Sequence, residues 1–157
     1  MSEHKSTAKT AKEAFSESAL KHIAEVIAEV EEHTSAEIRV SILDERPFED
    51  GGLALDALAL KEFTRLGMHS TKGQNGILLY IIFEEHKYYI CGDKGINDRV
   101  DTNTWEDVAT TIKSHFKEGH FEEGVVSGLR AIKDHLCIAL PPEATNPNEL
   151  PNEVVMR

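Results

Sequence analysis

The chain has 157 residues, of which 40% are hydrophobic and 29% charged, a composition typical of a soluble globular protein with one domain. Its net charge of -11 disfavours nucleic acids and anionic membrane surfaces as partners, because an acidic surface repels both. No segment has the apolar length of a signal-peptide core or a membrane span, which predicts a cytoplasmic protein without membrane insertion.

The N-terminal third predicts a disordered segment, a helix and a strand. Residues 1–10 are polar and are expected to be disordered. Thr10 and Glu13 have capping-box spacing, so a helix is predicted from here to near Glu32. The apolar stripe of this helix consists of Phe15, Ala19, Ile23, Ile27 and Val30. The next apolar residues, Ile38, Val40 and Ile42, alternate with Arg39 and Ser41, which predicts a strand with one solvated face.

The middle of the chain predicts a second helix followed by a hairpin. Apolar residues at helical spacing predict a helix over residues 55–66, which Gly67 ends. Residues 77–83 are seven consecutive apolar side chains, which suit a strand buried on both faces. A polar break and a second short apolar run over residues 88–91 predict a return strand. The crossover helix makes the first two strands parallel, and the hairpin adds the third antiparallel.

The C-terminal part predicts two helices and a tail. The helices are expected over residues 104–118 and 121–140, and Gly124 and Gly128 lie four apart on the second, where they would let a neighbour approach closely. Residues 141–157 are rich in proline and predict an extended tail. We therefore expect an α/β domain over residues 11–140, with a small mixed sheet and helices on both faces.

Two edges of this sheet carry polar residues. At the carboxyl ends of the parallel strands, Asp44 and Glu45 face the charged hairpin loop at residues 84–86, and ordinary solvated loops explain this set better than a site does. The opposite edge, where the first two strands begin and the third ends, gathers side chains that can offer oxygen ligands. They are Thr34, Ser35, Glu37, Thr71, Asn75, Asp93, Asn97, Asp98 and Asp101. Calcium and magnesium prefer such oxygens, although each residue alone also has an ordinary structural interpretation as a cap, turn or ion pair.

Signals for other chemistry are weak. The chain has no Gly-x-Ser-x-Gly elbow and no Walker loop, so neither nucleophilic catalysis nor a nucleotide is predicted, and we expect no haem. Cys91 and Cys137 lack metal-ligand spacing and are interpreted as buried free thiols, with a single disulfide as the less favoured alternative.

The order of several short motifs resembles that of TPM domains. The matching segments are TSAEIRV at residues 34–40, LGM at 66–68, NGIL at 75–78, GDKGI at 92–96, Trp105, FKEGHFEEG at 116–124 and NELP at 148–151. The resemblance covers roughly residues 15 to 155 and implies a three-layer α/β/α sandwich with a Rossmann-like sheet. Ala36 departs from the family's usual glycine, and the segment at residues 91–93 departs from its usual Gly-Tyr-Gly.

The functions that the resemblance implies are diverse. Some TPM proteins act in photosystem II repair in the thylakoid lumen, a weak acid phosphatase activity has been ascribed to one, and some bind calcium or other divalent cations through acidic loops. One animal member modulates a receptor.

Three hypotheses follow. The first is a regulatory or interaction module that binds Ca²⁺ or Mg²⁺ through Glu37, Asn75, Asp93 and Asp98, with the hydroxyls of Thr34 and Ser35 supporting these ligands. The second is a metal-dependent acid phosphatase in which Asp93 is the base or nucleophile. The third is a protein-interaction domain that pairs with an unknown protein partner through the tail or the hairpin edge.

Overall fold

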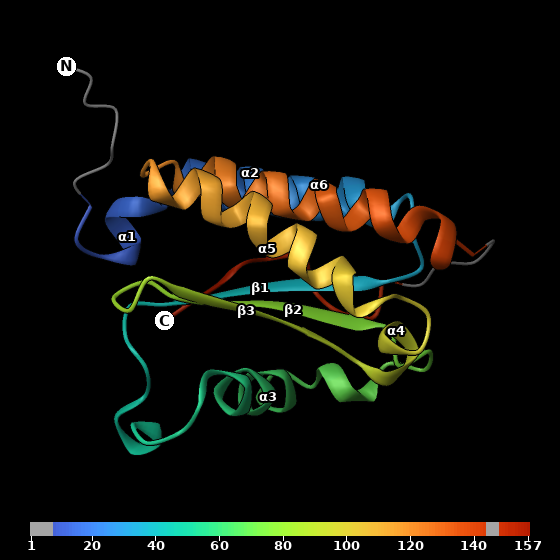
Figure 1. The fold of residues 1–157 in the computed structure, drawn as a ribbon, viewed down its shortest axis with the longest axis horizontal. Helices are drawn as coiled ribbons and strands as arrows, with labels where there is room; N and C mark the ends of the chain where they lie inside the picture. Colours follow the sequence, from blue (N-terminus) through green and yellow to red (C-terminus); the bar gives the residue numbers. More distant parts are fainter. Residues whose placement is uncertain (1–7, 144–147) are drawn as a thin grey trace.

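Three layers make up the molecule, in which helices cover both faces of a central sheet (Figure 1). This computed structural model describes residues 8–143 and 148–157. Most of the predicted disordered segment, residues 1–10, therefore lies outside the described residues, as does part of the predicted tail. The predicted α/β/α sandwich with a small mixed sheet is confirmed. No helix in the described part of the chain combines the length and apolarity that a membrane span requires.

The N-terminal helix is broken in two, where the sequence predicted one. The helices are α1, Ala11–Ala14, and α2, Glu17–Glu31. Thr10 and Glu13 do form the predicted capping box, but it starts only α1. Phe15 then takes an extended backbone, and the Ser16 hydroxyl accepts a hydrogen bond from the Ala19 backbone to start α2. This break lets the buried Phe15 ring pack against Phe121, with 6.2 Å between the centroids of the two rings.

Four strands lie in the order β3-β2-β1-β4. They are β1, Glu37–Leu43; β2, Gly76–Ile82; β3, Lys87–Gly92; and β4, Val155–Met156. As predicted, β1 and β2 are parallel, β3 is antiparallel to β2, and β2 is buried along its whole length. The prediction of a solvated face on β1 is wrong, because all seven of its residues are buried.

A hydrogen bond to α3, Leu55–Arg65, satisfies Ser41, one of the polar residues buried in β1. Ser41 donates this 2.6 Å hydrogen bond to Glu62 on α3. Glu62 also accepts hydrogen bonds from Arg65 and Arg157, and these bonds outweigh the effect of its burial and lower its pKa to about 2. Alternating polarity therefore identified the strand but could not show that α3 covers its second face.

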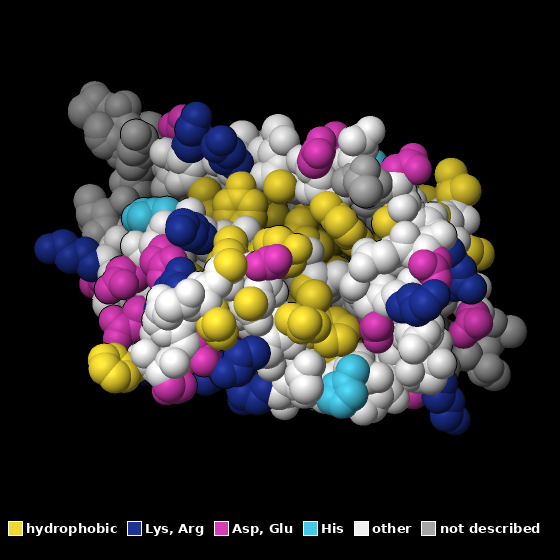
Figure 2. Space-filling model, turned by 60° about the horizontal axis from the view of Figure 1, so that its bottom comes forward, with side chains coloured by type: hydrophobic (Ala, Val, Ile, Leu, Met, Phe, Trp, Pro, Cys, Tyr) yellow, Lys and Arg dark blue, Asp and Glu magenta, His cyan; other side chains and the backbone are white. Residues whose placement is uncertain are grey.

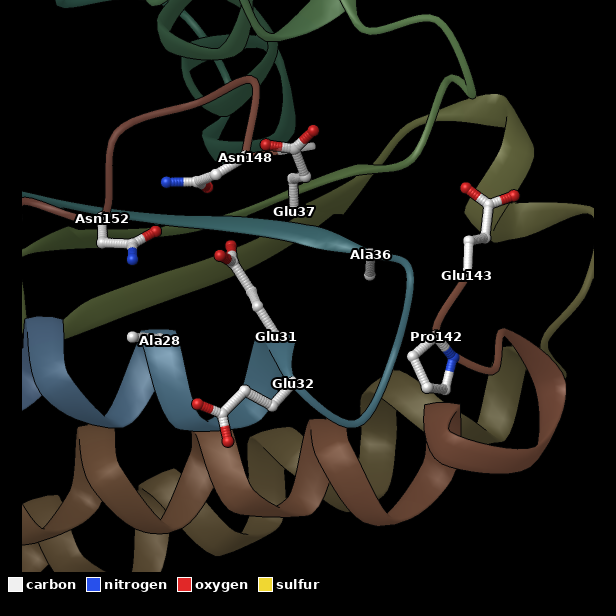
Figure 3. Close-up of a pocket in the computed structure, with 9 residues that line it drawn as sticks. All are labelled: Ala28, Glu31, Glu32, Ala36, Glu37, Pro142, Glu143, Asn148 and Asn152. Atoms are coloured by element: carbon white, nitrogen blue, oxygen red, sulfur yellow. The ribbon is translucent and has the colours of Figure 1, made fainter. Parts of the chain in front are cut away.

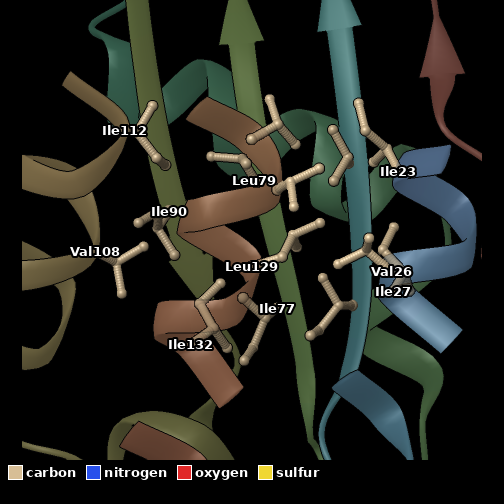
Figure 4. Packing of buried hydrophobic residues seen from close by; sticks show 14 of the residues in the cluster. Ile23, Val26, Ile27, Ile77, Leu79, Ile90, Val108, Ile112, Leu129 and Ile132 are labelled. Atoms are coloured by element: carbon tan, nitrogen blue, oxygen red, sulfur yellow. The ribbon is translucent and has the colours of Figure 1, made fainter. Parts of the chain in front are cut away.

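The main core lies between the sheet and α2, α5 and α6 (Figure 4). Helices α5, Thr102–Lys117, and α6, Phe121–Ala139, pack closely because two glycines of α6 face α5. A Cβ atom on Gly128 would lie 2.6 Å from the Ile112 side chain, and one on Gly124 would lie 2.7 Å from the Phe116 ring. The predicted close approach at these glycines is confirmed.

A second, smaller core lies beneath α3 and includes Leu58, Phe63 and Met68. The remaining short elements connect the layers. They are the 3-10 turns η1, Phe48–Asp50, and η2, Met68–Ser70, and the one-turn helix α4, Lys94–Asn97.

The C-terminal segment joins the sheet instead of only resting on it. β4 pairs in parallel with β1, and Arg157 donates its backbone N–H to Ile42 and accepts from Asp44. Leu150 is buried in the smaller core. The sequence predicted only an extended tail here, because a two-residue strand is too short to give a pattern.

At the other side of the sheet, β3 is an open edge. Tyr89 is 38% exposed, and next to it a shallow groove of about 230 Å³ lies between β3 and α5, lined partly by Tyr88 and Trp105. Figure 2 shows hydrophobic side chains gathered across the middle of the face that it draws. This hairpin edge is the surface that the interaction hypothesis named, and that hypothesis stays a prediction.

Candidate functional site

The candidate site is the edge where β1 and β2 begin and β3 ends, called here the strand-entry edge. The Glu37 backbone N–H donates to the Asn75 carbonyl, and the Asp93 N–H donates to the Gly76 carbonyl, both at 2.9 Å. Three of the four predicted ligands, Glu37, Asn75 and Asp93, are thus joined through neighbouring strand ends. Each of the three also has one buried side-chain oxygen with no hydrogen-bond partner.

The side chains of Asn75 and Asp93 are each fixed by one hydrogen bond to the backbone. Asp93 caps α4: its Oδ1 accepts from the Lys94 N–H at 2.8 Å, while Oδ2 is buried and unpartnered. The Asn75 amide nitrogen donates to the Ser35 carbonyl, which leaves its Oδ1 buried and unpartnered. A buried oxygen without a partner loses the hydrogen bonds of water and gains nothing in return, so these two atoms favour a positively charged or donor group.

Close packing fixes α4 against the loop that precedes β2. A Cβ atom on Gly95 would lie 2.4 Å from the Gly73 carbonyl oxygen and 2.6 Å from that of Gln74, so only glycine fits at this position. Gln74 itself has a φ of 51° and therefore makes a left-handed turn ahead of Asn75. The segment GDKGI, which the resemblance singled out, thus packs its turn directly on the Asn75 loop.

Beside these residues, an acidic pocket of about 390 Å³ lies between α2, the start of β1 and the C-terminal segment (Figure 3). Its lining consists of Ala28, Glu31, Glu32, Ala36, Glu37, Pro142, Glu143, Asn148 and Asn152. Glu37 is only 3% exposed; its Oε1 accepts from the Leu150 N–H at 2.7 Å, and its Oε2 has no partner. The Asn152 Oδ1 is likewise buried without a partner.

Glu31 connects the three walls of the pocket. Its Oε2 accepts from the Ile38 N–H at 2.8 Å, on the part of β1 that β4 does not reach. The Asn148 amide places one end 3.3 Å from Glu31 Oε1 and 2.9 Å from the Leu150 carbonyl, and two acceptors require that this end be the NH₂ group. Figure 3 shows Glu31 reaching from α2 toward β1, beside Asn152.

Burial dominates the electrostatics of this pocket. Burial raises the pKa of Glu31 to about 7, although the hydrogen bond from Ile38 opposes this, and the negative charge of Glu37 raises it further. Burial also raises the pKa of Glu37; the Leu150 N–H opposes it, and the Glu149 carboxylate adds to it. Acidic groups that repel one another in a buried site favour a bound cation, because it relieves both the burial and the repulsion.

Comparison with known proteins identifies the family. A sequence profile described as the TPM domain matches residues 9–135, most of the chain. The chain belongs to the TPM domain family. This confirms the resemblance on which the sequence analysis relied, and no curated protein matches this TPM domain.

Solved structures support the same conclusion. BA42 from the psychrophilic bacterium Bizionia argentinensis, solved by NMR, is 31% identical, with a TM-score of 0.85 over 96% of this TPM domain and 100% of BA42. The N-terminal domain of a P. gingivalis protein shares the fold at 20% identity, with a TM-score of 0.65 over 81% of this chain and 79% of that one. The N-terminal domain of cg2496 from Corynebacterium glutamicum does so at 15% identity, with a TM-score of 0.59, covering 76% and 72%.

The remaining predicted site residues of this TPM domain have local partners. Asp98 has a side chain 60% exposed and pairs with Lys94 at 2.7 Å. The Thr34 hydroxyl donates to the Leu140 carbonyl at 2.6 Å and accepts from the Ala36 N–H, and Ser35 contributes its carbonyl to Asn75. Within the described ranges, no three His, Cys, Asp or Glu side chains come together closely enough to hold a metal ion.

At the opposite edge of the sheet, some of the charged residues have structural partners. Arg46 forms a two-pronged ion pair with Glu85, and Asp44 accepts from the Ala11 backbone N–H at 2.6 Å. These contacts give Arg46, Glu85 and Asp44 structural roles, and the interpretation of the whole edge as ordinary solvated loops stays a prediction.

Sequence reasoning missed Glu31 and Asn152. Glu31 carried a signal, because it follows Ile27 by four residues and so continues the buried stripe of α2 with a carboxylate. Asn152 carried none, since the tail gives no pattern that would bring it to α2.

Proposed function

We propose that this TPM domain is a regulatory or interaction module that binds a divalent cation, Ca²⁺ or Mg²⁺, at the strand-entry edge. Asn75 Oδ1 and Asp93 Oδ2 are the ligands, and backbone carbonyls and water complete the coordination. The observation that carries the proposal is that these two oxygens are buried and unpartnered although their residues are otherwise well bonded. A hard cation is the partner that a carboxylate and an amide oxygen together prefer.

The charge count predicts weak binding. This set of ligands has one carboxylate, and calcium affinity falls as the number of charged ligands falls, so we expect a dissociation constant on the order of 1 mM. Asp98 lies outside the set because Lys94 holds its carboxylate. Glu37 also lies outside it, because its carboxylate lines the acidic pocket.

A titration of the ¹⁵N-labelled protein with CaCl₂ and MgCl₂, followed by NMR, tests the proposal. We expect saturable shifts in the amides of residues 73–76 and 92–96, which Asp93→Asn abolishes. Asp98→Asn is the matched control: it removes an exposed carboxylate on the same turn and leaves the shifts unchanged. The proposal fails if the wild-type amides of these segments do not shift, or if both variants reduce the shifts equally, as diffuse attraction of cations to an acidic surface would cause.

The metal-dependent phosphatase remains the alternative that the sequence raised. No specific feature favours it: the hydrogen bond that the Asp93 side chain accepts comes from the Lys94 backbone N–H, which caps α4. A phosphomonoester assay of the same two variants with each metal decides the point. Turnover that persists on repurification and disappears in Asp93→Asn would make the cation site catalytic.

A further inference from the structure

The acidic pocket is a second site whose chemistry differs from that of the Asn75–Asp93 pair. We propose that it binds an organic cation carrying several N–H donors on an aliphatic stem, with a guanidinium group seated against Glu37 and Asn152. The proposal concerns a different ligand and different side chains from the divalent-cation site, and it does not depend on it.

Two buried acceptors that line the pocket have no hydrogen-bond partner among the described residues. Glu37 is nearly completely buried, yet its Oε2 has no partner, and the same is true of Asn152 Oδ1 across the pocket. As a carboxylate oxygen and an amide oxygen, both atoms accept hydrogen bonds. The occupant that satisfies them must therefore be a donor, because a buried acceptor without a partner has lost the hydrogen bonds of water.

The negative charge of the pocket lining also favours a cation. The lining carries four glutamates, Glu31, Glu32, Glu37 and Glu143, and no lysine or arginine among the described residues lines the pocket. Mutual repulsion and burial both disfavour ionised Glu31 and Glu37. A cation relieves both effects at once, whereas an anion or a neutral ligand would relieve neither.

The size of the cavity decides between a metal ion and an organic cation. A metal ion needs ligands converging to distances of about 2.0–2.6 Å. The acceptors instead border a cavity of about 390 Å³, which is the size of a small organic ligand site. A planar guanidinium presents five donors in a fixed fork and can reach separated oxygens.

The pocket also has apolar wall segments that an aliphatic stem of the ligand could contact. Ala28, Ala36 and Pro142 give the pocket apolar wall segments beside the carboxylates. Such walls suit the methylene chain of an arginine-like or agmatine-like molecule, because long cationic side chains bury their stems against apolar surface. A hydrated metal ion gains nothing from these walls.

The experiment uses two probes that differ in one group. N-acetyl-arginine amide carries the guanidinium, and N-acetyl-citrulline amide replaces it with a neutral urea of nearly the same shape. Titrated into the ¹⁵N-labelled protein, the arginine probe is expected to shift the amides of residues 31, 37, 38 and 148–152 saturably, with at least ten-fold tighter binding than the citrulline probe.

Agmatine in a parallel titration distinguishes a free metabolite-like amine from an arginine within a peptide: tighter binding of agmatine favours the free molecule, and tighter binding of the capped arginine favours the peptide.

Variants locate the site. Glu37→Gln retains an acceptor for Leu150 but removes the charge, and it is expected to weaken the arginine probe at least ten-fold; Asn152→Ala provides a second, partly exposed position if Glu37→Gln fails to fold. Glu25→Gln, an exposed carboxylate elsewhere on α2, is the control and leaves binding unchanged.

The proposal is overturned if neither probe binds, if the citrulline probe binds equally, or if Glu25→Gln weakens binding as much as Glu37→Gln. Asp93→Asn should leave the arginine probe unaffected, so that failure of this site and failure of the metal site give different results.

Discussion

At the scale of single residues, buried carboxylates set the character of this molecule. Glu31 and Glu62 are both nearly inaccessible, yet their environments move the pKa in opposite directions. Glu62 is buried among arginines and a serine hydroxyl, and these donors outweigh its burial and lower its pKa to about 2. At Glu31 the effect of burial outweighs that of the hydrogen bond from the Ile38 N–H, and the negative charge of Glu37 adds to it.

The raised pKa of Glu31 predicts a pH-dependent stability. The folded protein holds this proton up to a pH of about 7, whereas the unfolded chain loses it near 4.5, so the free energy of unfolding falls as the pH rises between these values. The shift corresponds to at most about 3 kcal/mol. Glu31→Gln removes the titration, and its amide oxygen still accepts from Ile38 while Asn148 can turn to pair with its nitrogen.

Urea denaturation at pH 5 and pH 8 measures this effect. Wild type is expected to lose up to about 3 kcal/mol more than Glu31→Gln between the two values. Glu25→Gln, an exposed change on the same helix, should keep the wild-type difference. Equal pH dependence in wild type and Glu31→Gln would show that Glu31 titrates normally.

At the scale of elements, the contact between α5 and α6 decides how the helical layer covers the sheet. Glycine at positions 124 and 128 lets the α6 backbone approach the Ile112 and Phe116 side chains, and it costs helix propensity at each place. The strand-entry edge depends on a similar approach, that of Gly95 to the Asn75 loop. In both places a side chain would force the two elements apart.

Gly128→Ala tests the helix contact. Propensity alone would stabilise α6 by roughly 1 kcal/mol, but the new Cβ would lie 2.6 Å from the buried Ile112 side chain. We expect the clash to prevail and stability to fall by about 1–3 kcal/mol. Ser127→Ala, on the preceding and partly exposed position, is the control and should be neutral or stabilising. A rise in the thermal midpoint of Gly128→Ala would mean that Ile112 moves aside at little cost.

At the scale of the whole molecule, the C-terminal segment completes the sheet and closes one wall of the acidic pocket. Arg157 bonds to β1 through its backbone and to Glu62 through its side chain, and Leu150 enters the smaller core. The segment is therefore part of the domain in a structural sense, whatever sequence boundary is drawn at residue 140.

Deleting residues 154–157 tests this role. The deletion removes β4 and the Arg157–Glu62 ion pair, so we expect a loss of about 2 kcal/mol or more of unfolding free energy. Hydrogen exchange gives the sharper result: the Asp44 amide, which donates to the Arg157 carbonyl, should exchange at least ten-fold faster, while amides between β1 and β2 keep their protection. Unchanged protection of Asp44 would contradict the pairing as a stable feature.

Much of the fold could be predicted because its signals are local. The seven apolar residues of β2, the stripes of the helices and the glycine stops each depend on periodicity within a short window. Ser16 was overlooked because the capping box at Thr10 lies so close before it. The two-residue β4 is too short to give a period at all.

For the candidate site, the sequence predicted which edge of the sheet carries the polar residues but not how their side chains are bonded. Parallel pairing of β1 and β2 and the hairpin to β3 require that Glu37, Asn75 and Asp93 meet, and that follows from chain order alone. Which of their oxygens lack partners does not follow, because it depends on where the Leu150, Ser35 and Lys94 backbones lie.

By itself, the sequence determined the layered α/β fold, the family and the edge at which polar side chains gather, since each rests on local patterns and on the order of elements. Only the tertiary structure decided that β1 is buried on both faces and that Glu31, Glu37 and Asn152 line one pocket. The physical reason is that burial and charge pairing are set by residues more than a hundred positions apart, here α2, β1 and the C-terminal segment, whose contact leaves no periodic trace in the chain.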